Sequence, residues 1–232
     1  EKNFNSYVRT IYNGLNDIPS GEVNDIVSTN DGIMWIGSYA GLYRHNGTEF
    51  RFMHEFDSIR SVKCLYVDDE GRLFVGTNDN GLSIVINETV MNVLEEKNGL
   101  PADSVRCITR SSDGFYYVGT ASEMAVISIN GGLEVAAVIN EIESAKKITA
   151  DDSDRVATVT SDGTLFIVQD KKIVWDSKST GEHFTTAAFG TDGLLYAATE
   201  KNSLLVFELS GNPVRIVEAV HSMDCGTLRH IN

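Results

Sequence analysis

The sequence predicts an all-β fold in which one small sheet is repeated along the chain. The first observation is a recurring pattern, in which an Asp-Gly or Glu-Gly turn is followed by aromatic and β-branched residues, a glycine, and Thr or Ser. The second observation is the spacing, because the equivalent turn positions follow one another at intervals of 39, 43, 40 and 39 residues. These positions are Gly32, Gly71, Gly114, Asp154 and Gly193. A fixed period of this length indicates one supersecondary unit stacked many times.

Residues 59–99 show how one unit is built. An apolar run ends at the turn 68–71, in which glycine supplies a positive φ, and a second apolar run follows it. Gly76 lies inside that second run, where a glycine marks a bulge or a close approach of two backbones. The four strands predicted for this unit are residues 62–67, 72–77, 82–86 and 89–94.

Four short antiparallel strands in about forty residues are typical of one blade of a β-propeller. Solenoids of helix pairs share this period, but the segments here are short, rich in β-branched and aromatic residues, and separated by hairpin turns. Only residues 139–147 have a composition that tolerates a helix. The fold class predicted from the sequence is therefore an all-β propeller.

A single propeller is expected over residues 1–232, with about five four-stranded blades and flanking strands of an incomplete six- or seven-bladed ring. Residues 1–13 are expected to form the outer strand of the closing blade, and residues 221–232 the first strand of a further blade. An open arc of this kind exposes strand edges, which favour pairing with another chain. The five blades are expected at about residues 22–58, 59–99, 100–143, 144–181 and 182–220.

The composition excludes several classes of protein. The net charge is −14, from 19 basic and 33 acidic residues, which argues against nucleic-acid binding. No stretch of 18 apolar residues is present, so no membrane span is predicted within the chain. The three cysteines form no Cys-x-x-Cys pair, which argues against a disulfide framework or a structural zinc site. Cys64 and Cys107 occupy the same position in consecutive units and are expected to be small buried core residues.

Several linked positions of the first unit resemble the two-component regulator propeller repeat. That pattern combines a Gly-Leu opening, a turn glycine, a Trp-Ile-Gly strand and a Gly-Leu-aromatic strand. The matching residues are Gly14-Leu15, Pro19-Ser20, Gly32, Trp35-Ile36-Gly37, Gly41-Leu42-Tyr43-Arg44 and Asn46-Gly47. The second and third units match well, whereas the fourth and fifth keep the period but carry Val159 and Ala198 in place of the strand glycine.

The resemblance implies a non-catalytic, extracytoplasmic sensor domain of a hybrid histidine kinase or a similar membrane-bound signalling protein. A carbohydrate or another small molecule is then the expected ligand, with no cofactor and no nucleic acid as partner. The resemblance also implies a membrane helix downstream of this chain, so that contact with the membrane comes only through segments outside it. Self-association as a dimer through the propeller edges is expected from the open arc.

Basic residues recur at one position of the predicted innermost strand. The second, third, fourth and sixth units carry Lys63, Arg106, Lys146 and Arg229 there. Asn24 and Thr185 take this position in units one and five. Because innermost strands line the centre of a propeller, these side chains are expected to form a cationic collar that attracts a carboxylate, sulfate or phosphate. The alternative is that they flank the strand and pair with turn carboxylates such as Asp68 or Asp151.

Two aromatic residues are candidates for a binding surface. Tyr39 and Tyr43 lie near the first inter-strand turn, where amphipathic rings can stack on a sugar. The alternative for Tyr43 is packing within its own blade.

No catalytic residue and no metal ligand is predicted. The sequence lacks a Gly-x-Ser-x-Gly motif, and the five histidines show no metal-binding spacing. The acidic clusters 68–70 and 151–154 could gather calcium, but hairpin turns favour Asp because it bonds its own backbone. Two other functions stay open: a propeller hydrolase or lyase acting on carbohydrate or lactone, and a scaffold that binds proteins through its blade edges.

Overall fold

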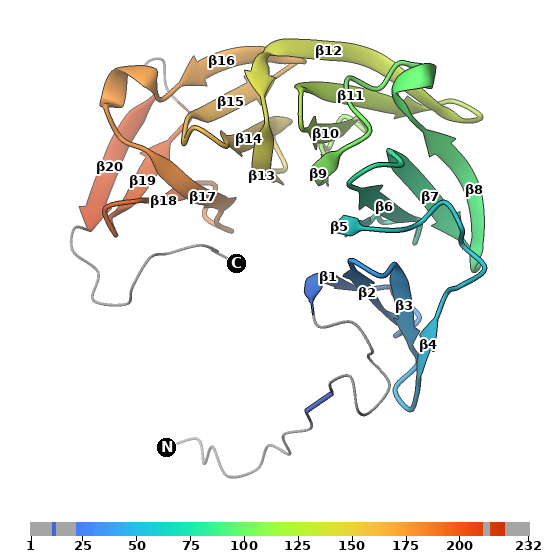
Figure 1. Cartoon of the computed structure of the whole chain (residues 1–232). Coiled ribbons are helices and arrows are strands. Elements are labelled where there is room, and N and C mark those ends of the chain that lie inside the picture. Colours follow the sequence, from blue (N-terminus) through green and yellow to red (C-terminus); the bar gives the residue numbers. More distant parts are fainter. Residues whose placement is uncertain (1–10, 13–21, 211–213, 221–232) are drawn as a thin grey trace.

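The computed structural model describes residues 11–12, 22–210 and 214–220 of the chain. These residues form five four-stranded antiparallel sheets with the strands in sequence order within each sheet. The sheets are arranged around a common centre, here termed the hub, and the first strand of each sheet lies nearest to it (Figure 1). The predicted all-β propeller is therefore confirmed. Apart from residues 11 and 12, the edge strands expected at 1–13 and 221–232 lie outside the described residues.

The sheets are termed blades 1 to 5 in chain order. Blade 1 contains β1 (Val23–Ser28), β2 (Met34–Ser38), β3 (Leu42–His45) and β4 (Phe50–Phe52). Blade 2 contains β5 (Val62–Val67), β6 (Leu73–Thr77), β7 (Leu82–Ile86) and β8 (Thr89–Leu94). Blade 3 contains β9 (Val105–Arg110), β10 (Tyr116–Thr120), β11 (Glu123–Ile129) and β12 (Leu133–Glu143). Blade 4 contains β13 (Ala145–Ala150), β14 (Arg155–Thr160), β15 (Leu165–Gln169) and β16 (Lys172–Asp176). Blade 5 contains β17 (Phe184–Phe189), β18 (Leu195–Thr199), β19 (Leu204–Glu208) and β20 (Arg215–Val220).

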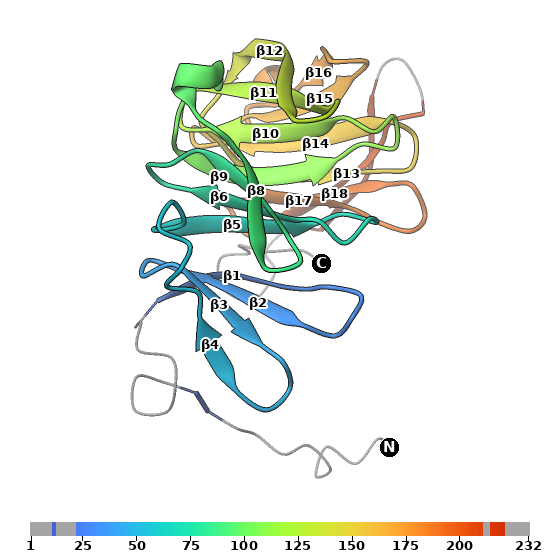
Figure 2. The ribbon, with the colours of Figure 1, turned by 90° about the vertical axis from the view of Figure 1, so that its right-hand side faces the viewer.

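Two short 3₁₀ helices, η2 (Glu96–Asn98) and η3 (Lys178–Thr180), lie in connections between blades. The strands of blade 2 lie within the ranges that the sequence predicts for them. The helix tolerance of residues 139–147 is not realised, because these residues lie largely in β12 and β13. Each blade is strongly twisted, so that the outer strand β8 crosses the direction of the inner strand β5 (Figure 2).

The hydrophobic core lies between the blades rather than within them. Successive side chains of a strand point to opposite faces, so each blade contributes one apolar face to each neighbour. Trp35 and Leu42 of blade 1 pack on Leu65 and Leu73 of blade 2, and equivalent clusters join blades 2 to 3, 3 to 4 and 4 to 5. Burial of these faces is the main force that holds the blades side by side.

The strand glycines of the repeat allow neighbouring blades to approach closely. A Cβ atom on Gly37 would lie 2.4 Å from Val62 Cγ1, and one on Gly76 would lie 2.5 Å from Cys64 Sγ and 2.6 Å from Val105 Cγ1. The close approach expected at Gly76 is therefore confirmed. The repeated glycine is needed because the first residue of the next inner strand occupies the space of a side chain.

Every inner strand carries an irregularity at the same place near its start. In blade 2 the register moves from Val62 opposite Thr77 to Cys64 opposite Gly76, which leaves one residue without a cross-strand partner. The same shift occurs in the other four blades. The extra residues of these β-bulges are Asn24, Lys63, Arg106, Lys146 and Thr185. A β-bulge inserts one unpaired residue and redirects its side chain.

Cys64 and Cys107 follow this bulge in blades 2 and 3 and are buried free thiols, as the sequence predicts. Burial raises the pKa of Cys64 well above its ordinary value and that of Cys107 to about 12. We therefore expect neither thiol to react with Ellman's reagent at pH 8 in a folded Cys225→Ser variant. Both should react fully in guanidinium chloride. Rapid labelling of the folded protein would contradict the tight packing between blades.

Candidate functional site

A cleft with a volume of about 610 Å³ lies between blade 1 and blade 2. It lies where the β1–β2 turn of blade 1 meets the β5–β6 and β7–β8 turns of blade 2. Its apolar lining residues are Ile33, Trp35, Leu73 and Val85. Its charged lining residues are Asp31, Arg44, Asp69, Glu70 and Glu88. Polar and charged residues therefore make up most of the lining, with the four apolar side chains between them.

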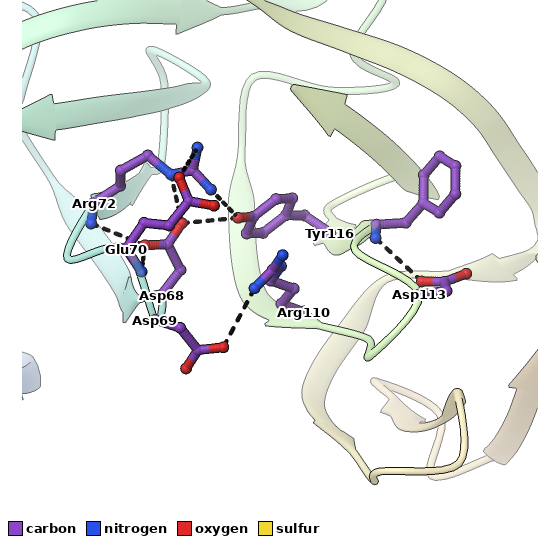
Figure 3. A network of polar contacts seen from close by, with 8 residues as sticks. Asp68, Asp69, Glu70, Arg72, Arg110, Asp113 and Tyr116 are labelled. Atoms are coloured by element: carbon purple, nitrogen blue, oxygen red, sulfur yellow. Dashed lines mark hydrogen bonds and ion pairs between the residues drawn. The ribbon is translucent and has the colours of Figure 1, made fainter. Parts of the chain in front are cut away.

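The corresponding place between blades 2 and 3 is occupied by a polar cluster (Figure 3). Arg72 Nε donates to Asp68 Oδ2 at 2.6 Å, and Tyr116 Oη donates to the same oxygen at 2.8 Å. The Tyr116 ring stacks on Phe74 with 4.5 Å between ring centroids. Asp68 is only 3% exposed, so its charge depends on these two partners.

Three residue differences between the repeat units distinguish the cleft from the filled interface of blades 2 and 3. Each residue of the polar cluster has a counterpart at the cleft, at the same distance in sequence from the turn glycine of its own unit. These counterparts are Thr29, Ile33 and Leu73. Thr29 corresponds to Asp68, Ile33 to Arg72, and Leu73 to Tyr116. The smaller side chains leave the space between blades 1 and 2 unfilled.

Electrostatics indicate what the cleft can bind. Arg44 Nε pairs with Glu88 Oε1 at 2.8 Å, and Arg51 Nη1 reaches Glu88 Oε2 at 3.1 Å. The hydrogen bond from Thr29 lowers the pKa of Asp31, which keeps this carboxylate ionised at neutral pH. With four carboxylates and one guanidinium around it, the cleft disfavours an anion. It can offer acceptors and donors to the hydroxyl groups of a neutral ligand.

The structure places Lys63, Arg106 and Lys146 at the bulges of three consecutive inner strands, which are the strands nearest to the hub (Figure 1). Lys63 is exposed, and the other two are half-buried. Arg229 lies outside the described residues.

The alternative, in which these cations pair with turn carboxylates, is wrong for the two carboxylates that it named. Asp68 accepts a hydrogen bond from Arg72 Nε and Asp151 accepts one from Arg155 Nε, both at 2.6 Å. Both acidic residues follow an inner strand, whereas the bulge lies near the start of that strand. The cations and these carboxylates therefore belong to opposite ends of the blades.

The two tyrosines have different environments. Tyr39 lies in the turn after β2 and is 68% exposed, so it stays a candidate for stacking on a ligand. Tyr43 is only 1% exposed and packs on its cross-strand partner Phe52, with 4.9 Å between ring centroids. Its prediction as a surface aromatic is wrong, because the strand turns this side chain onto the covered face of the sheet.

Among the described residues, no group of three or more His, Cys, Asp and Glu side chains is placed to hold a metal ion. The acidic turns use their carboxylates internally: Asp68 and Asp151 each accept backbone and guanidinium hydrogen bonds from an arginine four residues later. The ranges that the structure describes also contain no helix long and apolar enough to cross a membrane.

Sequence reasoning missed the cleft entirely. Its lining residues come from two blades and carry no motif of their own. The available signal was a comparison of the units with one another, in which Leu73 stands where the next unit has Tyr116.

Comparison with known proteins agrees with this architecture. The model of a family described as two component regulator propeller matches residues 17–40, which include the Asp31-Gly32 turn and the Trp35-Ile36-Gly37 strand. No curated protein matches the chain.

Solved structures share the fold at low sequence identity. The extracellular domain of a hybrid two component system from B. thetaiotaomicron superposes with a TM-score of 0.71 and 18% identity, over 87% of this chain and 29% of that chain. Virginiamycin B lyase from Staphylococcus aureus gives a TM-score of 0.62 and 15% identity, over 86% of this chain and 69% of that one. A catalytically inactive variant of the lyase with quinupristin gives 0.65 and 13%, over 89% and 71% of the two chains.

The chain thus spans less than a third of the two-component protein's extracellular domain, and at these identities the likeness shows the fold alone. The match of residues 17–40 to the family model is independent of that likeness. The chain is a β-propeller whose residues 17–40 are similar to the two component regulator propeller repeat.

Proposed function

We propose that the chain is a non-catalytic, extracytoplasmic ligand-sensing domain of a bacterial membrane-bound signal-transduction protein. The family repeat at residues 17–40 and the shared fold with the extracellular domain of a hybrid two component system support this proposal. The anchor is then a membrane helix outside this chain, and the output is a kinase or a similar module that follows it.

The ligand of this sensor is a neutral small molecule or oligosaccharide that binds in the cleft between blades 1 and 2. The observation that carries this assignment is the contrast between the two neighbouring interfaces. Asp68, Arg72 and Tyr116 fill the space between blades 2 and 3, whereas Thr29, Ile33 and Leu73 leave about 610 Å³ between blades 1 and 2. Apolar side chains beside carboxylates and a guanidinium suit a hydroxyl-rich molecule.

Signalling follows from the position of the cleft between two blades. A ligand that contacts both blades favours the arrangement in which it binds best and shifts the population toward it. The bias then passes to the membrane-proximal part of the protein, either within one chain or through a dimer formed at the propeller edges.

The test is to transplant the polar cluster into the cleft. A Thr29→Asp, Ile33→Arg, Leu73→Tyr variant should fill the space as Asp68, Arg72 and Tyr116 do one interface further on. Ligands are first identified by isothermal titration of the wild type with a panel of neutral oligosaccharides. The transplanted variant is then expected to lose at least tenfold in affinity for any of them.

An Asp113→Asn variant is the control, because Asp113 lies in the equivalent turn of blade 3, away from the cleft. It should bind as the wild type does. Unchanged affinity in a folded transplanted variant would overturn the assignment of the cleft. Failure of the wild type to bind any neutral saccharide, combined with dimer formation, would favour the scaffold function instead.

A propeller lyase or hydrolase is the second candidate, favoured by the fold shared with virginiamycin B lyase. The two functions differ in what happens to a bound ligand. After prolonged incubation of the protein with its ligand, mass spectrometry should find the ligand of a sensor intact. More moles of cleaved product than of protein would establish the enzyme.

A further inference from the structure

The bulge gives one side chain of each inner strand an unusual position. The residue before it faces the preceding blade and the residue after it faces the following blade, as Val62 and Cys64 do in blade 2. The inserted residue belongs to neither face. The inner strand pairs with only one neighbour in its sheet, so the inserted residue lies beside a strand edge that faces the hub (Figure 1).

Hydrogen bonds of the inserted residues support this placement. Asn24 Nδ2 donates to the carbonyl oxygen of Val62, in the next inner strand, at 2.7 Å. Arg106 Nη1 donates at 3.3 Å to Ser161 Oγ, which lies just after β14 of blade 4. Both side chains therefore reach the following blade, whereas Thr185 Oγ1 donates to the carbonyl oxygen of Ala198 in its own blade, at 3.3 Å.

The three described cations at this position form no ion pair with a described carboxylate. Elsewhere in the described chain, most arginines form ion pairs, which involve Arg44, Arg51, Arg60, Arg72, Arg110 and Arg155. Among the described residues, Lys63, Arg106 and Lys146 take part in no ion pair. Asp25, the acidic residue of the adjacent inner strand β1, accepts the backbone N–H of Leu65 at 2.7 Å.

Three positive charges on consecutive blades, none of them in an ion pair with a described residue, repel one another in a protein whose net charge is −14. An anion at the hub would relieve that repulsion, and a guanidinium can hold a carboxylate, sulfate or phosphate through two parallel hydrogen bonds. The exposed Tyr39 lies at the same end of the blades as Lys63. Its backbone carbonyl accepts the N–H of Ser61, which is two residues before Lys63. Its ring can cover an apolar face of such a ligand.

We propose that Lys63, Arg106 and Lys146 form a binding site for a small molecule that carries several carboxylate, sulfate or phosphate groups. This site is separate from the cleft. The bulges lie near the start of the inner strands, whereas the cleft is built from turns that follow β1, β5 and β7. One domain would then recognise a neutral group at one end of the blades and an anionic group at the other.

The experiment compares sucrose octasulfate with sucrose, two probes that differ in charge, by isothermal titration in 50 mM and 300 mM NaCl. The wild type should bind the octasulfate, bind it more weakly at the higher salt concentration, and show no comparable affinity for sucrose. Arg106→Glu and Lys63→Glu should each lower the affinity for the octasulfate at least tenfold.

Matched controls separate a site from general electrostatics. Arg215→Glu and Lys172→Glu make the same change in net charge at exposed positions of the outer strands β20 and β16. They should alter the affinity less than twofold. Equal losses in the hub variants and the controls, or no binding by the wild type, would overturn the proposal. If Arg106→Glu does not fold, a Lys63→Gln, Lys146→Gln double variant provides the same comparison.

The outcome is distinguishable from that of the cleft experiment. The transplanted cleft variant should keep its affinity for the octasulfate, since none of its three substitutions lies at a bulge. Loss of octasulfate binding in the transplanted variant would show that the probe occupies the cleft, and would overturn the hub site.

Discussion

Replacing Asp68 by Asn is expected to lower the free energy of unfolding by about 3 kcal/mol or more. The Asp68 side chain is fully buried and receives hydrogen bonds from Arg72 Nε and Tyr116 Oη, so that it joins blade 2 to blade 3. The amide removes the negative charge but leaves the guanidinium of Arg72, whose side chain is only 17% exposed. Arg72 then keeps only its ion pair with Glu70 Oε2, at 3.0 Å, and the Glu70 side chain is 60% exposed. Breaking a buried pair of charges is strongly destabilising. Urea denaturation followed by tryptophan fluorescence measures the difference.

Asp69→Asn is the matched control, because it removes the same charge one residue further on. Its side chain is 96% exposed and pairs with Arg110 at 3.3 Å, an arrangement that contributes little in water. The control should change the free energy of unfolding by less than about 0.5 kcal/mol. Equal effects of the two variants would show that the polar cluster does not join the blades.

The pH dependence of the Asp68→Asn effect is a second test of the same cluster. Burial raises the pKa of Asp68, but hydrogen bonds from Arg72 and Tyr116 outweigh it, so the pKa lies below its ordinary value of 3.8. A carboxyl with a depressed pKa stabilises the folded state above its unfolded pKa and loses that contribution as pH falls through the folded pKa. The difference between wild type and variant should therefore be constant from pH 6 to 8 and shrink below about pH 4.

Replacing Gly119 by Val is expected to cost about 3 kcal/mol, through overpacking between blades 3 and 4. A Cβ atom there would lie 2.5 Å from Cys107 Sγ and 2.7 Å from Ala145 Cβ, both of which are buried. Neither neighbour is the end of a flexible side chain, so the blades must separate. The free energy of unfolding from urea denaturation is again the measurement, and the Cys107 thiol should also become reactive.

Gly132→Ala is the control for the glycine substitution. The nearest atom to a Cβ at Gly132 is Asn92 Nδ2, at 3.8 Å, which is ordinary contact. This variant should remain within about 0.5 kcal/mol of the wild type. A Gly119→Val variant as stable as this control would show that the close approach of the blades is not required for stability.

The fold was predictable because its determinants are local and repeated. Each unit carries its own turn glycine, apolar strands and strand glycine, so the pattern from Val62 to Leu94 already specifies one blade. The spacing of the units then required the blades to be stacked side by side. Gly76 indicated a bulge or a close approach, but not that the inserted residue is Lys63 on the inner strand, because an inserted residue leaves the apolar pattern of that strand nearly unchanged.

The sites were less predictable, because they depend on contacts between units. Tyr43 was proposed for a surface, but its cross-strand neighbour Phe52 covers it. The cleft arises from side chains that are too small to meet across an interface, and a motif search detects residues that are present rather than space that is unfilled. Only an alignment of one blade with the next, Leu73 against Tyr116, reveals it.

The bulge of the inner strand also has an evolutionary consequence. Since the inserted residue takes part in neither interblade core, Asn24, Lys63, Arg106, Lys146 and Thr185 can differ in charge and size without disturbing the packing beside them. Mutations at these five places could retune what the centre of the molecule recognises while the scaffold retains its stability. Descendants of a single repeat would in this way acquire new chemical preferences one blade at a time.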